Sequence, residues 1–126
     1  MKTNPLNIRK SKDLFLGELK TTGNFKVFIN RKYGVRAAIK IIQTYIVKHH
    51  YDTIRKIIYH WAPSYENDTS AYIKFVSSHM KYDPDAVISS KALFLSLVHA
   101  MAIYESNINL TNKCLLDAYN LAFPDK

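Results

Sequence analysis

Apolar residues recur at three- and four-residue spacing along most of the chain after residue 32, which is the period of a helix with one buried face. The first run extends from Tyr33 to Lys48. A second run follows and ends at Pro63, because proline disfavours a helical residue before it, and Asp52 is its predicted N-terminal cap. The apolar positions are Val35, Ala38, Ile39, Ile42 and Ile46 in the first run and Ile54, Ile57, Ile58 and Trp61 in the second.

A third helix is predicted to begin near Asp68 and Thr69. Its apolar face carries Tyr72, Phe75, Val76 and His79. Further along, Asp83-Pro84-Asp85 has the form of a cap with proline at the first helical position, so we expect a helical start there as well.

Two more helices complete the predicted pattern. The run from about Ser90 to Glu105 is apolar on nearly every side, which is typical of a central, buried helix. Thr111 is expected to cap a last helix that ends near Phe123 and Pro124.

The first 30 residues show no clear helical period. Two short apolar runs, Leu14–Leu19 and Asn24–Ile29, lie on either side of a Gly-Asn turn, and this pattern predicts a small β-hairpin. The pattern therefore predicts a mainly α fold of the α+β class, with about five helices and a small N-terminal hairpin. A chain of 126 residues fits one domain, residues 1–126.

Composition is that of a globular protein rather than a disordered one, with 48% hydrophobic and 22% charged residues. Cys114 is the single cysteine, which excludes an internal disulfide and suits a reducing compartment. We expect it to be a small buried apolar residue.

Residues 1–7 have no apolar run behind their positive charge, so we predict no secretory signal peptide and synthesis in the cytoplasm. Polar residues interrupt every apolar stretch before it reaches membrane-spanning length, so no membrane span is expected. A formal charge of +8 favours anionic surfaces: nucleic acid, lipid headgroups or envelope polymers. The basic residues form no block of five or six, which favours a generally positive face over a nucleic-acid-binding tail.

Glu105 stands at the end of the apolar run from Ser90, and the chain has only two other glutamates, Glu18 and Glu66. An acid among apolar neighbours is costly unless it is paired, lies at a surface or is used in chemistry. Glu105 is therefore either a helix-end acid facing water or an acid that emerges into a cleft.

The stretch Glu105-Ser106-Asn107-Ile108-Asn109 resembles the Glu-Ser-x-x-Asn end of the catalytic helix in lytic transglycosylases and related lysozyme-fold enzymes. This resemblance implies a lysozyme-like single domain with Glu105 as the general acid. Such an acid protonates the glycosidic oxygen as the sugar becomes oxocarbenium-like.

A wider series of motifs resembles a family of small phage and prophage proteins that are often labelled virion structural proteins. That family usually has glycine where this chain has Leu6, and often has His-Glu-Asn-Gly where this chain has Tyr104-Glu105-Ser106-Asn107. The motifs, in order along the chain, are Asn4–Arg9, Phe25–Phe28, Tyr33–Ala37, Thr53–Arg55 and Trp61–Ile73.

The order of the segments differs from that in lysozyme-fold glycosidases. There the catalytic helix precedes the segment of Asn-x-x-x-Ile-Lys/Arg character, whereas here Asn7-Ile8-Arg9 comes first and the glutamate helix comes near the end. A circular permutation of the lysozyme-like domain would produce this order. Chain termini commonly lie close together at the surface, which makes such a permutation physically cheap.

A hydrolase would need a second carboxylate, and Glu66 and Asp68 are the candidates. A lytic transglycosylase needs none, because the substrate's own hydroxyl can close on the cation. We take Glu105 and Glu66 as candidate catalytic residues and Asp68 as a candidate substrate-binding residue. Asp68 is also a natural helix cap, so both roles stay open for it.

The other candidate substrate-binding residues are polar or aromatic groups near these acids. Each has a structural alternative: the aromatic rings, with Trp61, can pack in the core instead of stacking on sugars, and the N-terminal pair can hold the chain end in place. They are Asn7, Arg9, Tyr65, Tyr72 and Asn109.

No metal or cofactor is expected, because the five histidines have no metal-ligand spacing and Gly34 is isolated from other glycines.

The leading hypothesis is a phage- or prophage-derived peptidoglycan glycosidase, a muramidase or lytic transglycosylase, that acts in a virion or at the bacterial cell wall or periplasm. Its partners would be glycan strands and components of a virion or a secretion device. The alternative is a non-catalytic virion structural or cell-wall-binding protein. A helical nucleic-acid binder is the weakest hypothesis.

Overall fold

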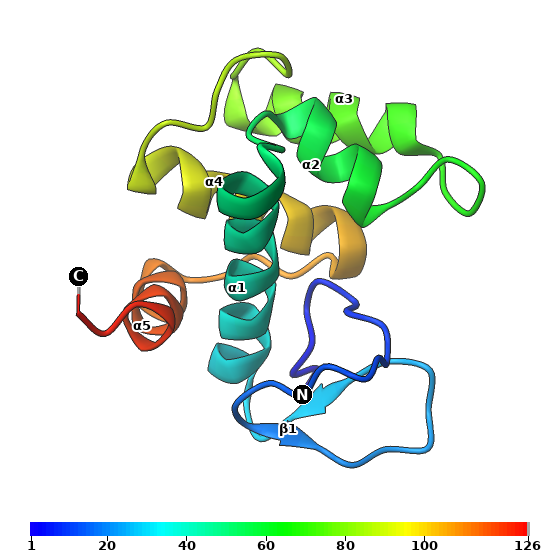
Figure 1. The fold of residues 1–126 in the computed structure, drawn as a ribbon, viewed down its shortest axis with the longest axis vertical. Coiled ribbons are helices and arrows are strands. Elements are labelled where there is room, and N and C mark those ends of the chain that lie inside the picture. Colours follow the sequence, from blue (N-terminus) through cyan, green and yellow to red (C-terminus); the bar gives the residue numbers. More distant parts are fainter. Residues whose placement is uncertain (126) are drawn as a thin grey trace.

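The centre of the molecule is α1 (Arg31–His49), which contacts β2, α2, α4 and α5 (Figure 1). The computed structural model describes residues 1–125. The side chain of Asn30 starts α1 by accepting a hydrogen bond from the amide of Tyr33, and His50 ends it in the left-handed conformation. Residues of the predicted periodic face are buried, as the spacing predicted: Val35, Ala38, Ile39 and Ile42.

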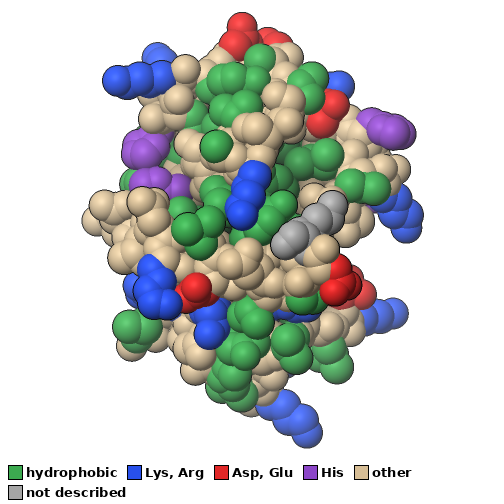
Figure 2. All heavy atoms as spheres, turned by 90° about the vertical axis from the view of Figure 1, so that its left-hand side faces the viewer, with side chains coloured by type: hydrophobic (Ala, Val, Ile, Leu, Met, Phe, Trp, Pro, Cys, Tyr) green, Lys and Arg blue, Asp and Glu red, His purple; other side chains and the backbone are tan. Residues whose placement is uncertain are grey.

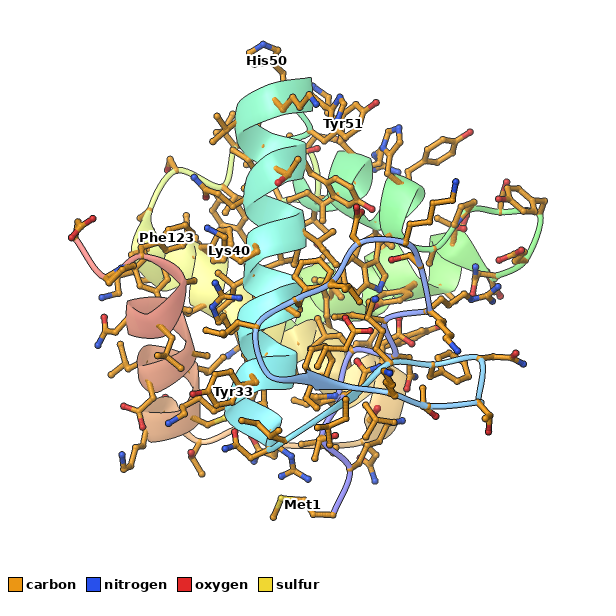
Figure 3. All side chains as sticks on the ribbon, turned by 60° about the horizontal axis from the view of Figure 1, so that its bottom comes forward. Met1, Tyr33, Lys40, His50, Tyr51 and Phe123 are labelled. Atoms are coloured by element: carbon orange, nitrogen blue, oxygen red, sulfur yellow. The ribbon has the colours of Figure 1, made fainter. Side chains whose placement is uncertain are left out.

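Four more helices follow α1, and their order agrees with the sequence pattern apart from the helical start expected at Asp83. They are α2 (Ile54–Trp61), α3 (Thr69–Met80), α4 (Lys91–Ser106) and α5 (Asn112–Ala122). α2 packs on α3, α3 packs on α4, and α5 lies along α1. In Figure 3, Lys40 of α1 and Phe123 lie beside each other at this last contact, with the ammonium group 5.1 Å from the ring centre.

The predicted caps are partly confirmed. Asp68 and Thr111 cap α3 and α5 through their side chains, and Ser90 caps α4. The predicted cap Asp52 is wrong, because Thr53 takes that position and accepts a hydrogen bond from the amide of Lys56 at 3.2 Å. Thr53 is extended, with φ of −121°, and either residue type can cap a helix, so the sequence does not separate them.

Asp83-Pro84-Asp85 does not start a helix; it forms a turn. The Asp83 side chain accepts a hydrogen bond from the amide of Asp85 at 2.7 Å, which closes the turn locally. The Pro84 carbonyl accepts from the amide of Arg55, and Ile88 donates to the Asp52 carbonyl. These bonds tie the segment to the start of α2, so tertiary pairing replaces the helix that the local pattern predicted.

The predicted N-terminal hairpin is present, with shorter strands than the apolar runs indicated. β1 (Glu18–Leu19) pairs antiparallel with β2 (Val27–Phe28). Phe28 faces the core and is 1% exposed. Lys26, which precedes β2, is also buried, and its ammonium group lies 3.0 Å from the Glu18 carboxylate and 2.7 Å from the Asp13 carbonyl oxygen.

α4 buries one broad face against α1 and α3 rather than its whole surface. Leu97, Val98 and Met101 are fully buried, whereas Leu95 and Ile103 are half-buried and Tyr104 is 39% exposed. Cys114 on α5 is half-buried and carries a free thiol. Among residues 1–125, no helix is long and apolar enough to cross a membrane.

Candidate functional site

Glu105 lies in the last turn of α4, and its carboxylate accepts hydrogen bonds from three side chains. Asn7 Nδ2 donates to Oε1 at 3.0 Å. Trp61 Nε1 and the Tyr72 hydroxyl both donate to Oε2, at 3.2 and 3.0 Å. The three donors are neutral and come from three different segments, so the carboxylate joins the N-terminal loop, the end of α2 and the start of α3.

A dense set of hydrogen bonds holds Asn7 in place. Its backbone is left-handed, with φ of 55°, a conformation that asparagine tolerates better than most residues. The Asn4 side chain bonds the backbone of Ile8 in both directions and also donates to the Lys26 carbonyl. Ser106 donates to the Pro5 carbonyl at 2.7 Å, which ties the loop to the end of α4.

Gly34 of α1 explains how this loop reaches the core. A Cβ atom at Gly34 would lie 1.8 Å from the Thr3 carbonyl oxygen, so only glycine lets the N-terminal segment pass this close to the helix. Gly34 is therefore needed for packing of the N-terminal segment, and it does not belong to a phosphate-binding loop.

Tyr72 is buried behind Glu105 and stacks on Tyr104, with ring centres 4.0 Å apart. Burial raises the pKa of Tyr72 well above its ordinary value, and the negative charge of Glu105 and the hydrogen bond to it push the pKa in the same direction. The hydroxyl therefore keeps its proton and acts as a fixed donor to Glu105.

An open cleft of about 550 Å³ lies in front of Glu105. One wall is the N-terminal loop and hairpin, and the other is the end of α2 and the loop that follows it. Aromatic rings line much of the surface, and Tyr65 is 82% exposed. The lining residues include Asn7, Arg9, Phe25, Tyr45, Trp61, Tyr65, Glu66, Asn67 and Glu105.

An ion pair joins the two walls of the cleft. Arg9 Nη1 from the N-terminal loop lies 3.1 Å from Glu66 Oε2 on the loop between α2 and α3. Both side chains are well exposed, at 65% and 39%, so water screens the pair and its contribution to stability is small.

The structure brings together most of the residues that the sequence singled out. Glu105, Glu66, Asn7, Arg9 and Tyr65 line the same cleft. Tyr72 is not part of the lining; it lies behind Glu105 as a hydrogen-bond donor.

Two candidates lie apart from this cleft. Asp68 caps α3, with its carboxylate accepting from the amide of Ala71. Asn109 lies after α4, and its side-chain oxygen is 2.5 Å from Nε2 of His99. Neither is among the residues lining the cleft in front of Glu105.

Several lining residues, among them Phe25, Tyr45 and Asn67, were not singled out from the sequence, and Trp61 was not foreseen as a donor to Glu105. Phe25 and Tyr45 belong to apolar patterns, so only their partial exposure in the fold separates them from core residues. Asn67 adjoins Glu66 and Asp68, and its exposed position before a helix was the available signal.

Within the described part of the chain, residues 1–125, no three His, Cys, Asp or Glu side chains are grouped so as to hold a metal ion. The arrangement in the cleft is one carboxylate with fixed neutral donors, a second carboxylate paired with arginine, and aromatic walls. These groups can bind a polar ring-shaped ligand and exchange a proton with it.

No family model matches the sequence. Over 80 residues, the chain is 41% identical to Protein P5 of Pseudoalteromonas phage PM2. Over this stretch the chain is similar to a phage protein. The match takes in 60% of this chain and 50% of Protein P5, so the chain spans about half the length of this relative. The similarity supports the phage part of the resemblance seen in the motifs and carries no statement about a lysozyme-like fold.

Proposed function

We propose that the protein is a phage-derived peptidoglycan glycosidase in which Glu105 is the general acid. The observation that carries the proposal is the position of Glu105 in an open cleft with aromatic walls, held by three donors. Flat rings such as Tyr65 and Trp61 suit the apolar faces of sugars. In this proposal residues 1–126 form one lysozyme-like domain, circularly permuted, that acts in a virion or at the cell wall.

The two oxygens of Glu105 differ in their bonding. Oε2 accepts two side-chain hydrogen bonds, whereas Oε1 accepts one, from Asn7. Oε1 therefore has more room to carry a proton. That proton passes to the glycosidic oxygen as the bond to the sugar carbon breaks, and the leaving hydroxyl departs while the sugar becomes oxocarbenium-like.

Either of two steps can then complete the reaction. In hydrolysis, Glu66 serves as the second carboxylate and accepts a proton from the water that adds to the sugar carbon. In transglycosylation, a hydroxyl of the same sugar closes on that carbon and gives its proton to the Glu105 carboxylate, which yields an anhydro product without a second carboxylate. Arg9 already forms an ion pair with Glu66. Transglycosylation needs no second carboxylate, so it does not require Glu66 to leave this pair.

The test is the loss of turbidity of purified peptidoglycan sacculi with the natural protein, Glu105→Gln and Glu66→Gln. Asp85→Asn is a matched control, because Asp85 is an exposed, ion-paired acid outside the cleft lining. We expect Glu105→Gln to lose at least about a hundredfold in rate, as for a removed general acid, and Asp85→Asn to keep full activity. Circular dichroism would confirm that the variants fold.

Product mass separates the two reactions. Added water together with an inactive Glu66→Gln variant supports hydrolysis, and an anhydro sugar with an active Glu66→Gln variant supports transglycosylation. If the natural protein clears no sacculi from acidic to neutral pH, the enzymatic proposal fails.

A non-catalytic virion or wall-binding role is the second candidate. The observation in its favour is that Glu105 bonds three separate segments, which is also what a structural carboxylate does. In that case the natural protein clears no sacculus but still sediments with sacculi.

A further inference from the structure

The outer face of the N-terminal hairpin carries exposed aliphatic side chains that the cleft does not use. Together they form the hairpin patch, and they are 39–84% exposed. Its residues are Leu14, Leu16, Leu19, Val27 and Ile29. Figure 2 shows hydrophobic side chains gathered at the lower end of the molecule, where Figure 1 places the hairpin, with Lys and Arg side chains near the margins.

Strand alternation explains why these residues point outward. Lys26 and Phe28 are buried, so Val27 and Ile29, which alternate with them, face away from the core. Leu19 is the cross-strand partner of Val27 and lies on the same face.

The preceding loop extends the patch. Leu14 and Leu19 line one hollow on the surface. Ile29 donates its amide proton to the Gly17 carbonyl, which brings Leu16 and Gly17 beside the end of β2. These pairings bring the five residues close together, and an exposed apolar patch with a polar rim is a feature of protein and membrane interaction sites.

Lysines border the patch. Lys10 and Lys20 line the same hollow as Leu14 and Leu19, and Lys12 is exposed in the loop between them. Of the nearby acids, Glu18 is neutralised by the buried ammonium of Lys26, which leaves Asp13 as the exposed acid of this loop. The border is therefore net positive around an aliphatic centre.

We propose that the hairpin patch docks on the surface of an anionic phospholipid bilayer. Aliphatic side chains enter the boundary between headgroups and acyl chains while the flanking lysines meet the phosphates. A second copy of this chain fits less well, because a symmetric contact through the patch would bring the two lysine borders together. Nucleic acid would use the lysines and leave the aliphatic residues without a partner.

Docking in this way would hold the cleft close to the bilayer. Phe25 lines the cleft and lies two residues before Val27, so the patch and the cleft share the hairpin. The inference does not depend on the proposed glycosidase activity, since none of the five patch residues lines the cleft.

The test is co-sedimentation of the full chain with vesicles of equal parts phosphatidylglycerol and phosphatidylcholine, compared with pure phosphatidylcholine. Leu14→Ser/Leu16→Ser shortens the two most exposed side chains of the patch without touching the core. Val47→Ser/Tyr59→Ser is its control, because these apolar residues are 63% and 55% exposed on α1 and α2. Lys12→Gln/Lys20→Gln is compared with Lys48→Gln/Lys74→Gln, which removes the same charge from exposed helix positions elsewhere.

We expect binding to the anionic vesicles to weaken by about tenfold or more in Leu14→Ser/Leu16→Ser and by about fivefold for each lysine removed, while both controls bind like the natural protein. Three results would overturn the proposal: no binding to anionic vesicles, equal loss in the patch variants and their controls, or a dimer in sedimentation that only the patch variant abolishes. Sacculi contain no phospholipid, so the turbidity assay reports on the cleft independently of this result.

Discussion

At the scale of single residues, the bonding of Glu105 couples chemistry to stability. A carboxylate can accept from Asn7, Trp61 and Tyr72 at once, because it has acceptor positions on both oxygens. An amide in its place has only one oxygen, so an NH₂ group would face one of these donors.

This conflict gives a stability prediction for Glu105→Gln. We expect the free energy of unfolding to fall by about 1–3 kcal/mol, the usual cost of leaving a buried donor or acceptor unsatisfied. Urea titration followed by circular dichroism measures it. Asp117→Asn, on an exposed acid of α5, should change the value by far less. A Glu105→Gln variant as stable as the natural protein would mean that the three donors find other partners.

Tyr72 gives a prediction for alkaline pH. Its pKa in the folded protein is raised well above 10.0, first by burial and then by Glu105, so the unfolded chain releases this proton at lower pH than the folded one. The stabilising contribution is fully present below about pH 10 and is lost as the pH rises through the folded pKa.

The prediction is checked by thermal unfolding at rising pH. The natural protein should lose stability above about pH 10, and Tyr72→Phe should flatten that alkaline decline while being less stable at neutral pH. In Glu105→Gln, absorbance titration should show the Tyr72 pKa falling, but staying above its ordinary value, because burial remains. A pKa of Tyr72 unchanged by this substitution would contradict the coupling.

At the scale of elements, Gly34 sets the contact between the N-terminal loop and α1. Alanine favours a helix over glycine by about 1 kcal/mol, yet here its Cβ would meet the Thr3 carbonyl at 1.8 Å. Since backbone cannot move aside as a side chain does, we expect Gly34→Ala to lose about 1–3 kcal/mol of unfolding free energy.

Gly23→Ala is the matched control for that substitution, because the nearest atom to a Cβ there is 3.6 Å away. Its stability should stay within about 0.5 kcal/mol of the natural protein. Denaturant midpoints of the two variants provide the comparison, and a Gly34→Ala variant that gains stability would show that the close approach is not required.

The start of α2 gives an element-scale test of capping. Thr53→Ala removes the side-chain oxygen that accepts from Lys56 and should cost about 1 kcal/mol. Asp52→Ala removes only a long, partly exposed ion pair with Lys56, 3.8 Å apart, and should cost about 0.5 kcal/mol or less. Urea unfolding distinguishes the two, and the reverse order would restore Asp52 as the cap.

Helical periodicity predicted the five helices because each buries one continuous face, and such a face leaves its spacing in the sequence. The turn at Asp83-Pro84-Asp85 was mispredicted because its pattern also fits a helix start. What decides between the two is the pairing of Pro84 and Ile88 with the start of α2, which depends on the assembled fold.

At the scale of the whole molecule, the site draws its side chains from segments far apart in the chain. The acid could be singled out from the sequence, since it interrupts an apolar run. Its donors could not be assigned, because Asn7 lies 98 positions away and Trp61 44 positions away, and nothing local marks them as its partners. From the sequence Asp68 suited a helix cap better than the cleft, and it does cap α3 and lies outside the cleft lining.

The ion pair between Arg9 and Glu66 yields a prediction about binding rather than stability. Arg9→Gln and Glu66→Gln should each change the unfolding free energy by less than about 1 kcal/mol, because the pair is exposed. Both should alter the affinity for soluble glycan fragments, since the pair joins the two cleft walls. Isothermal titration with chitooligosaccharides measures that affinity. Unchanged affinity in both variants would mean that the ion pair does not contact the bound glycan.

The bond between Asn7 and Glu105 also bears on when the site can exist during synthesis. A ribosome extends the chain by nearly its whole length between making these two residues, and long-range contacts of this kind close late in folding. Unfinished chains that lack the end of α4 contain the N-terminal loop with Asn7 but not the acid that this loop orients. A cell making this protein is therefore exposed to an assembled site only after translation of α4 is complete.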